Sequence, residues 1–191
     1  KHLTVEFDLT AGQAKDVAAR AKKKYREIIA KLPEFDKRDR FEMNIVNCAM
    51  LAAFILCMPQ RPDIKTLTDY YAAAMMTPTM KAFCRASGKK KFTPKDIEGM
   101  KATAKLRAGD RNPYSWNMDF FEYEDGSGYE ARFTTCGICT LMQALGLYDL
   151  TPALCHLDYT MSDAGGASDF VREYTLASGG PYCDCGYHKK Q

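Results

Sequence analysis

Hydrophobic residues in the first part of the chain recur about every three or four positions, the spacing of helices that bury one face. The pattern predicts four helices, over residues 10–32, 36–58, 62–77 and 93–109. The first begins with Thr10 and Gln13 at capping-box spacing, and the last begins with Thr93 as N-cap and Pro94 at the first helical position. The Met and aromatic residues on these helices are interpreted as core rather than as a cofactor-binding surface.

From about residue 110 the apolar positions alternate instead, which is typical of strands with one buried face. Two hairpins are predicted, with arms at 115–124 and 128–135 and at 169–177 and 181–188. Two short helices are predicted between the hairpins, at 137–145 and at 151–164. The first is closed by Gly146, and the second has Thr151 as cap and Pro152 at its first position.

This order predicts an α+β fold, in which a helical N-terminal half packs on a small antiparallel sheet made of two hairpins flanking two helices. We expect a single α+β domain over 1–191, with the helical part at 1–109 and a part that carries a Cys-rich site at 110–191. Hydrophobic residues make up 46% of the 191, which is enough for a sizeable core and excludes wholesale disorder.

Membrane and secretion signals are not expected. The longest apolar run, Ala49 to Met58, is too short to span a bilayer. Residues 1–10 alternate rather than forming an apolar block, so no signal peptide is predicted. The sequence therefore predicts a cytoplasmic protein without a membrane partner.

Charge is divided unevenly along the chain. Residues 1–109 carry 22 Lys and Arg against 12 Asp and Glu, whereas residues 110–191 carry 5 against 12. Basic runs such as 22–24 and 89–91 are interpreted as solvent-facing helix positions, and no nucleic-acid motif accompanies them. No nucleic-acid partner is predicted. A scaffold whose basic helical half binds another protein stays an alternative, and a homo-oligomer is compatible with the sequence.

The chain contains many cysteines for its size: Cys48, Cys57, Cys84, Cys136, Cys139, Cys155, Cys183 and Cys185. A chain of this length without a predicted signal peptide favours reduced thiols over a disulfide framework. Cys48 and Cys57 lie in a predicted apolar helix, and together with Cys84 they are interpreted as small core residues. The other five are the candidates for chemistry.

Cys136 and Cys139 form a C-x-x-C motif at a predicted strand-to-helix junction, where the helix N-terminus favours a thiolate. Cys183 and Cys185 alternate along a strand and so share one face. Because a second C-x-x-C is absent, the usual zinc-ribbon pattern is not present. A metal held by Cys136, Cys139, Cys155 and Cys183 stays open, as does a thiol-rich, redox-sensing module without catalysis.

The predicted helix at 151–164 places Cys155, Asp158 and Tyr159 on one flank, next to its apolar stripe. His156 points to the opposite side, because neighbours in a helix do not face each other. Asp158 is therefore the better partner for Cys155. A carboxylate at this position needs compensation, which Arg172 on the following strand could supply.

Several motifs follow one another in the C-terminal third: C-G-I-C from Cys136, G-L-Y-D-L-T-P from Gly146, C-H-L-D-Y from Cys155, R-E-Y-T-L from Arg172, Gly179-Gly180 and Cys183-Asp184. This stretch, residues 135–187, resembles the signature region of the L-2-amino-thiazoline-4-carboxylic acid hydrolase family. The helical first half fits the family's layout without a diagnostic motif. Cys185 departs from the family pattern, in which an aromatic residue is expected after the Cys-Asp pair.

The resemblance implies a hydrolase that opens a cyclic amidine-like thiazoline carboxylate to a carbamoyl-cysteine product, acting on a small-molecule substrate without a resident cofactor. Attack on the C=N carbon needs a thiolate, a carboxylate-activated water or a metal-bound hydroxide. The resemblance implies Cys155 as nucleophile or site thiol, Asp158 as base or orienting group, and Arg172 as a clamp for the substrate carboxylate. The full expected set is Cys155, Asp158 and Cys183 as catalytic residues, with Cys136, Cys139, Tyr159 and Arg172 binding substrate.

Overall fold

The computed structural model of the chain describes residues 2–109 and 111–191. The helices are α1 His2–Glu6, α2 Ala11–Ile29, α3 Glu42–Cys57, α4 Ile64–Met75, α5 Pro78–Gly88, α6 Pro94–Ala108, α7 Gly137–Ala144, α8 Thr151–Cys155 and α9 Leu157–Gly165. The strands are β1 Met118–Glu122, β2 Gly128–Phe133, β3 Ser168–Val171 and β4 Cys183–Lys189, and short 3-10 helices occur at Tyr148–Leu150 and Leu176–Ser178. None of these described helices is long and apolar enough to cross a membrane.

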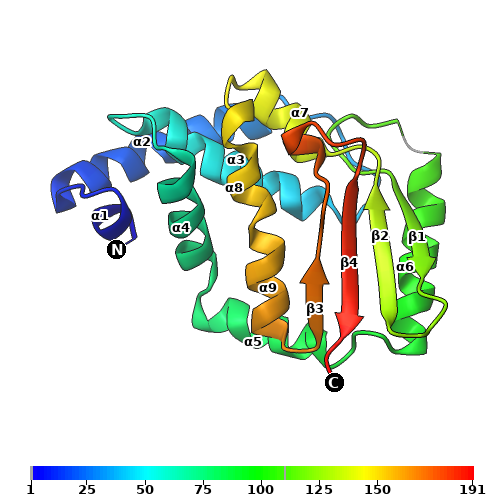
Figure 1. Ribbon diagram of the computed structural model, residues 1–191. Coiled ribbons are helices and arrows are strands. Elements are labelled where there is room, and N and C mark those ends of the chain that lie inside the picture. Colours follow the sequence, from blue (N-terminus) through cyan, green and yellow to red (C-terminus); the bar gives the residue numbers. More distant parts are fainter. Residues whose placement is uncertain (1, 110) are drawn as a thin grey trace.

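The strands pair into an antiparallel sheet in the order β1-β2-β4-β3 (Figure 1). The pairs β1–β2 and β3–β4 correspond to the predicted hairpins, and the pairing of β2 with β4 joins them. Helix α6 lies behind β1 in Figure 1, while α9 runs alongside β3. The arrangement confirms the predicted α+β class.

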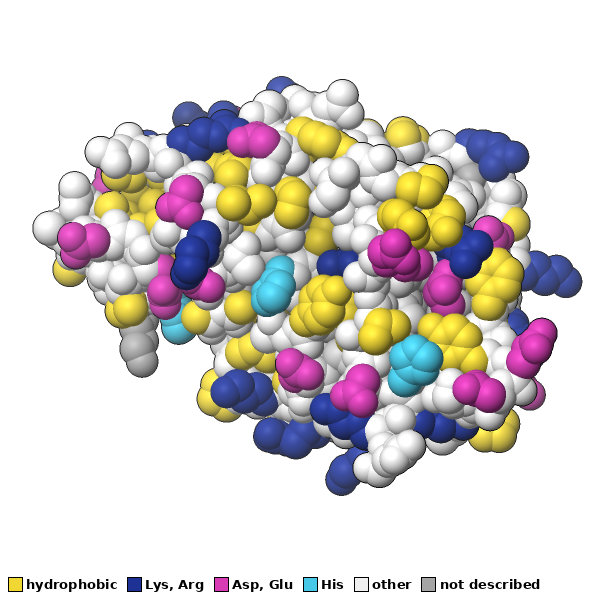
Figure 2. Space-filling model, in the orientation of Figure 1, with side chains coloured by type: hydrophobic (Ala, Val, Ile, Leu, Met, Phe, Trp, Pro, Cys, Tyr) yellow, Lys and Arg dark blue, Asp and Glu magenta, His cyan; other side chains and the backbone are white. Residues whose placement is uncertain are grey.

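One face of the sheet is covered and the other is open. In β3 the buried residues Ser168 and Phe170 alternate with the exposed residues Asp169 and Val171. Figure 2 shows the open face, over which acidic, basic and hydrophobic side chains are interspersed. The covered face, which meets the helices, is where an enclosed site can form.

The main core is built around α3, whose residues Ile45 and Ala52 are completely buried. They belong to one cluster with Leu67 of α4 and Met142 of α7, so the core joins the helical part to the cysteine-rich part. The cysteines that the sequence assigns to the core are indeed buried: Cys48, Cys57 and Cys84. Packing against α3 therefore fixes the position of α7, which borders the site described below.

Two helix starts follow the predicted cap chemistry. The Thr10 side chain accepts a hydrogen bond from the Gln13 backbone N–H, and the Gln13 side chain accepts one from the Thr10 backbone N–H. At α6 the Thr93 hydroxyl accepts from the Asp96 backbone N–H, and Pro94 occupies the first helical position. Local signals alone are sufficient to locate these boundaries.

The predicted helix 36–58 begins later than expected, at Glu42. The Asp36 and Asp39 carboxylates accept hydrogen bonds from the backbone N–H groups of Arg38 and Phe41, at 2.8 and 2.9 Å. These side-chain contacts compete with helical hydrogen bonds and hold the segment as turns.

Two helices were not predicted, α1 and α5. The Thr77 hydroxyl accepts from the Met80 backbone N–H at 3.1 Å, and Pro78 takes the first position of α5. A proline that ends one helix therefore starts the next. The spacing of residues 2–6 gives no comparable signal for α1.

The predicted strand 169–177 is wrong beyond Val171. The Asp184 carboxylate accepts hydrogen bonds from the backbone N–H groups of Glu173 and Tyr174, at 3.0 and 2.6 Å. This draws the chain away from the β4 ladder, and residues 176–178 form a 3-10 helix instead. As a result Arg172 lies at the point where the strand ends.

The predicted helix 151–164 is interrupted at His156, which separates α8 from α9. Thr151 is not its cap but its first residue, after Leu150. The sequence pattern misses the break because the apolar stripe continues across it.

A buried ion pair ties α6 to the segment before α3. Arg107 Nη1 lies 3.0 Å from Asp39 Oδ2, and both side chains are almost completely buried. The Ser115 hydroxyl donates to the same carboxylate, and Arg107 Nε donates to the Trp116 carbonyl at 2.8 Å. This network holds Trp116 and the start of α3 beside the site.

Candidate functional site

The central strands β2 and β4 form the floor of a cavity of about 370 Å³. Their register pairs Phe133 with Cys183, Ala131 with Cys185, and Tyr129 with Tyr187. All of these border the cavity, because residues two apart on a strand point to the same side. The prediction that Cys183 and Cys185 share a face is confirmed. The volume is within the range of roughly 300–1,000 Å³ usual for small-molecule sites.

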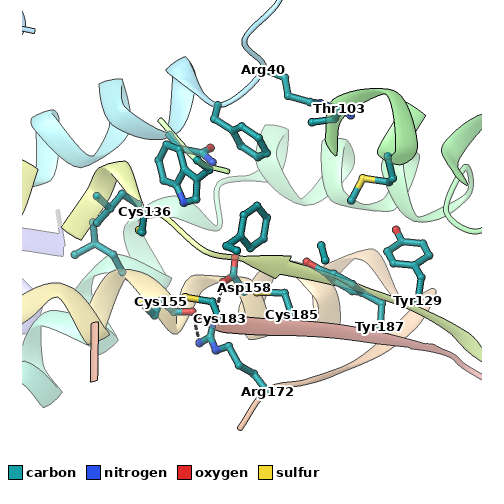
Figure 3. Close-up of a pocket in the computed structure, with 18 of the residues that line it drawn as sticks. Arg40, Thr103, Tyr129, Cys136, Cys155, Asp158, Arg172, Cys183, Cys185 and Tyr187 are labelled. Carbon is teal, nitrogen blue, oxygen red and sulfur yellow. Dashed lines mark hydrogen bonds and ion pairs between the residues drawn. The ribbon is translucent and has the colours of Figure 1, made fainter. Parts of the chain in front are cut away.

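Helices close the cavity around this floor (Figure 3). Cys136 comes from the start of α7, and Cys155 and Asp158 come from either side of the α8–α9 break. Arg172 reaches in from the end of β3, and the segment that begins with Arg40 forms the opposite wall with α6. The structure thus brings five of the predicted residues to one cavity: Cys136, Cys155, Asp158, Arg172 and Cys183.

Cys136 is the N-cap residue of α7. The Cys139 side chain, the backbone N–H groups of Cys139 and Ile138, and the Trp116 side chain all favour the charged form of its sulfur. These donors lower the pKa of Cys136 although burial opposes the charged form. The same contact with Cys136, together with burial, raises the pKa of Cys139. Cys136 is therefore the thiol of this pair that ionises first.

The start of α7 depends on a glycine. A Cβ at Gly137 would lie 2.0 Å from the Tyr114 carbonyl oxygen, far inside van der Waals contact. Only glycine allows this close approach of the two backbones. Gly137 thereby fixes the neighbouring Cys136 at the cavity wall.

The other thiols of the cavity have the opposite character. Burial raises the pKa of Cys155 to about 12, with Arg172 opposing the shift. Burial also raises the pKa of Cys183, against a hydrogen bond of 3.2 Å from the Leu176 backbone N–H, and raises that of Cys185. At neutral pH these thiols are protonated.

Asp158 and Arg172 form the charged centre of the cavity. Arg172 Nη1 lies 2.8 Å from Asp158 Oδ2, and Arg172 Nη2 donates to the Cys155 carbonyl at 2.9 Å. The Arg172 side chain is 7% exposed, whereas 45% of the Asp158 side chain is exposed although protein surrounds it, because it faces the cavity. Burial raises the pKa of the Asp158 carboxyl, and Arg172 limits that rise. The expectation that Arg172 compensates Asp158 is confirmed.

Three residues considered from the sequence lie outside the cavity lining. Cys139 lies next to Cys136, and Tyr159 donates a hydrogen bond to the Arg172 carbonyl at 3.4 Å. Their expected contact with substrate stays a prediction; in the structure both lie next to residues that line the cavity. His156 is exposed and stacks on Tyr159, facing away as the helical spacing predicts.

The sequence pattern missed several cavity residues, above all Lys91 and Arg40. The interpretation of 89–91 as a solvated run is wrong for Lys91, whose Nζ lies 3.4 Å from the centroid of the Tyr187 ring. Burial lowers the pKa of Lys91 to about 8. Nothing in a run of three lysines distinguishes the one that folds inward.

Among the residues described by the structure, no group of three or more His, Cys, Asp or Glu side chains is arranged to hold a metal ion. Of the thiols considered as metal ligands, Cys139 does not border the cavity that the others share.

Comparison with known proteins shows which family the chain belongs to. The family model for L-2-amino-thiazoline-4-carboxylic acid hydrolase matches residues 43–187, about three quarters of the chain. No curated protein and no solved structure gave a match. The matched region contains the cavity floor, α7, α8, α9 and Arg172. The chain belongs to the L-2-amino-thiazoline-4-carboxylic acid hydrolase family, a family of hydrolases.

Proposed function

We propose that this chain opens the ring of L-2-amino-thiazoline-4-carboxylate, or of a closely related cyclic amidine, by adding water and releasing a carbamoyl-cysteine product. The observation that carries the proposal is that Cys136, at the start of α7, and Asp158 border one cavity. A nucleophile with a lowered pKa and a carboxylate that can accept a proton are what this hydrolysis requires.

The reacting atom is the ring carbon bonded to sulfur, to the ring nitrogen and to the exocyclic nitrogen. In the first step the Cys136 thiolate attacks this carbon and the ring carbon–sulfur bond breaks. The departing sulfur takes a proton, and an isothiourea remains on Cys136. The lowered pKa of Cys136 supports this role, because the thiolate is the attacking form.

In the second step water attacks the same carbon; one of its protons goes to Asp158 and the other to the isothiourea nitrogen, which becomes the NH2 group of the product. Asp158 then releases its proton, which replaces the one taken up by the ring sulfur in the first step. The bond to Cys136 breaks, the thiolate is regenerated and N-carbamoyl-cysteine leaves. One water is consumed and no redox change occurs. Asp158 suits this step because its side chain faces the cavity and burial raises its pKa above that of an ordinary carboxyl.

Cys155 and Cys183 then act as protonated thiols rather than as nucleophiles. The sequence favours Cys155 as the nucleophile, but a pKa of about 12 keeps its sulfur protonated at neutral pH. A protonated thiol at the cavity wall can donate a proton or hydrogen bond to the departing ring sulfur. In this scheme the Cys136 thiolate attacks the ring carbon, and the protonated thiols of Cys155 and Cys183 act as donors.

The charges around the cavity support an anionic substrate. Three cationic side chains border it, Arg40, Lys91 and Arg172, against two carboxylates, Asp96 and Asp158. These cations provide countercharges for a carboxylate ligand in a partly enclosed space.

The proposal is tested by trapping the isothiourea. The protein is mixed with aminothiazoline carboxylate, quenched in acid and digested, and peptides are analysed by mass spectrometry while NMR follows ring opening. We expect the adduct on Cys136 in the wild type and no adduct in Cys136→Ser. Cys84→Ser, which removes a thiol outside the cavity, serves as control and should retain the adduct. An adduct confined to Cys155, or no ring opening by the folded wild type, would contradict the proposal.

A further inference from the structure

The substrate carboxylate needs a cation other than Arg172. The guanidinium of Arg172 already contacts the Asp158 carboxylate and the Cys155 carbonyl, and its side chain is only 7% exposed. Taking a second carboxylate would require breaking the pair that orients Asp158. Arg172 therefore positions Asp158, and another residue must recognise the anion.

Arg40 has the features that Arg172 lacks. Its side chain is exposed, it borders the cavity, and Nη1 donates to the Thr103 hydroxyl at 3.2 Å. Thr103 in turn donates to the Gly99 carbonyl at 2.8 Å, so the hydroxyl is fixed as an acceptor for Arg40. Within residues 2–109 and 111–191, no carboxylate forms an ion pair with Arg40. This contact orients the Arg40 guanidinium and leaves its other N–H groups available to a ligand.

Arg40 and the reactive groups lie at opposite ends of the cavity. Figure 3 shows Arg40 and Thr103 on one side and Cys155 and Asp158 on the other. Three aromatic residues that line the same cavity, Phe41, Phe133 and Trp116, pack against one another. The Phe41 ring lies 5.8 Å from that of Phe133 and 5.4 Å from that of Trp116, measured between centroids. Phe133 is opposite Cys183 in the sheet, and Trp116 favours the charged form of Cys136.

We propose that Arg40 binds the carboxylate of a substrate longer than aminothiazoline carboxylate itself, a cyclic amidine in which an apolar arm separates the ring from the anion. This inference rests on the proposed function for the reaction at the ring. Figure 3 shows Arg40 and Thr103 across the cavity from Cys155 and Asp158, so a ring held beside Asp158 leaves Arg40 for an anion carried further from the ring. An apolar arm places the anion at Arg40 and packs against Phe41. Arg40 also lies outside the residues that the family model matches, 43–187.

Lys91 is the competing anion site, and its surroundings argue against it. Its ammonium group already lies over the Tyr187 ring and 5.2 Å from the centroid of the Tyr129 ring. Asp96, which raises the pKa of Lys91, supplies a negative charge nearby. Arg40 also offers the planar, paired donors that match a carboxylate.

Binding without turnover tests the proposal. Calorimetry compares three ligands: aminothiazoline carboxylate, an aminothiazoline carrying a carboxyphenyl arm, and the methyl ester of the latter. In Cys136→Ser, which does not open the ring under the proposed mechanism, the arm-bearing acid should bind about tenfold or more tightly than its ester, the scale of a charge-assisted hydrogen bond. The Arg40 variants are compared in this same background. Arg40→Gln should remove this difference, and Arg40→Lys should restore part of it. Arg38→Gln, which breaks an exposed pair with Asp36, is the matched control and should change nothing.

The outcomes separate the two proposals. If Arg40→Gln removes the preference for the acid while no thiazoline is hydrolysed, the Arg40 site stands and the proposed reaction fails. If the ring carboxylate binds best, if none of the ligands binds, or if Lys91→Met rather than Arg40→Gln removes the preference, the Arg40 site is overturned. Thermal melting checks that each variant is folded.

Discussion

Arg172 and Asp158 form an ion pair of 2.8 Å in which the arginine is almost buried while the carboxylate remains open to the cavity. The two side chains of the pair therefore differ in their access to the cavity. The Arg172 side chain is held in place by burial, whereas the Asp158 side chain stays accessible to water or substrate from the cavity. The role of Arg172 is therefore to set the orientation and the pKa of Asp158.

This relationship predicts a shift in the pH profile. Arg172 lowers the pKa of Asp158 against the effect of burial, so Arg172→Gln should raise that pKa further. Because Asp158 must be ionised to accept a proton, the acidic limb of kcat should move to higher pH in the variant. The limb is measured by NMR turnover assays across the acidic range, with Arg38→Gln as control. An acidic limb that stays in place in a folded Arg172→Gln protein would show that Asp158 is not the base.

Thiol reactivity should follow the order of thiol acidity. Cys136 has a lowered pKa and borders the cavity, whereas burial raises the pKa of Cys155 to about 12 and raises that of Cys48. Iodoacetamide attacks thiolates, so at neutral pH Cys136 should be alkylated first and Cys48 last. A time course analysed by peptide mass spectrometry gives the order. Uniform slow labelling of all the cysteines would instead identify packed structural thiols.

The buried ion pair of Asp39 and Arg107 should contribute to the stability of the fold rather than to catalysis. Asp39→Asn leaves the Arg107 guanidinium without its countercharge and should lower the free energy of unfolding by about 3–5 kcal/mol. Asp36→Asn, which breaks an exposed pair in the same segment, should change it little. Urea unfolding followed by circular dichroism measures both. Equal stability of the two variants would mean that Asp39 is not the anchor described above.

Two glycine substitutions should have opposite signs. Gly137→Ala places a methyl group 2.0 Å from the Tyr114 carbonyl, so the start of α7 must shift and the protein should lose stability. Gly99→Ala meets no atom within 4 Å in the middle of α6 and should gain roughly 0.5–1 kcal/mol. Thermal melting of both variants is the measurement. A gain in stability for Gly137→Ala would contradict the close approach at Cys136.

Elements with local signals could be predicted from the sequence. The caps at Thr10 and Thr93 fixed two helix starts, and alternation placed Cys183 and Cys185 on one face. The α+β class followed from the order of the patterns. The sequence predicts that Cys155 and Asp158 lie together because it assumes one continuous helix. The helix is in fact interrupted at His156, yet both residues border the cavity.

Features that depend on distant residues could not be predicted. The strand after Val171 ends because Asp184, on the neighbouring strand, captures its backbone N–H groups. Lys91 turns inward because Tyr187 and Tyr129 meet it from the sheet. Such contacts are made only when the sheet forms, so the periodicity of the local sequence does not predict them.

The central claim, that Cys136 and Asp158 together hydrolyse the thiazoline ring, is tested most directly by turnover of aminothiazoline carboxylate in four proteins. The wild type and His156→Gln, which alters an exposed residue outside the cavity, should open the ring at similar rates. Cys136→Ser and Asp158→Asn, each shown to be folded by thermal melting, should be slower by a factor on the order of 10² or more. Full activity of Cys136→Ser or Asp158→Asn, or loss of activity in His156→Gln, would contradict the account.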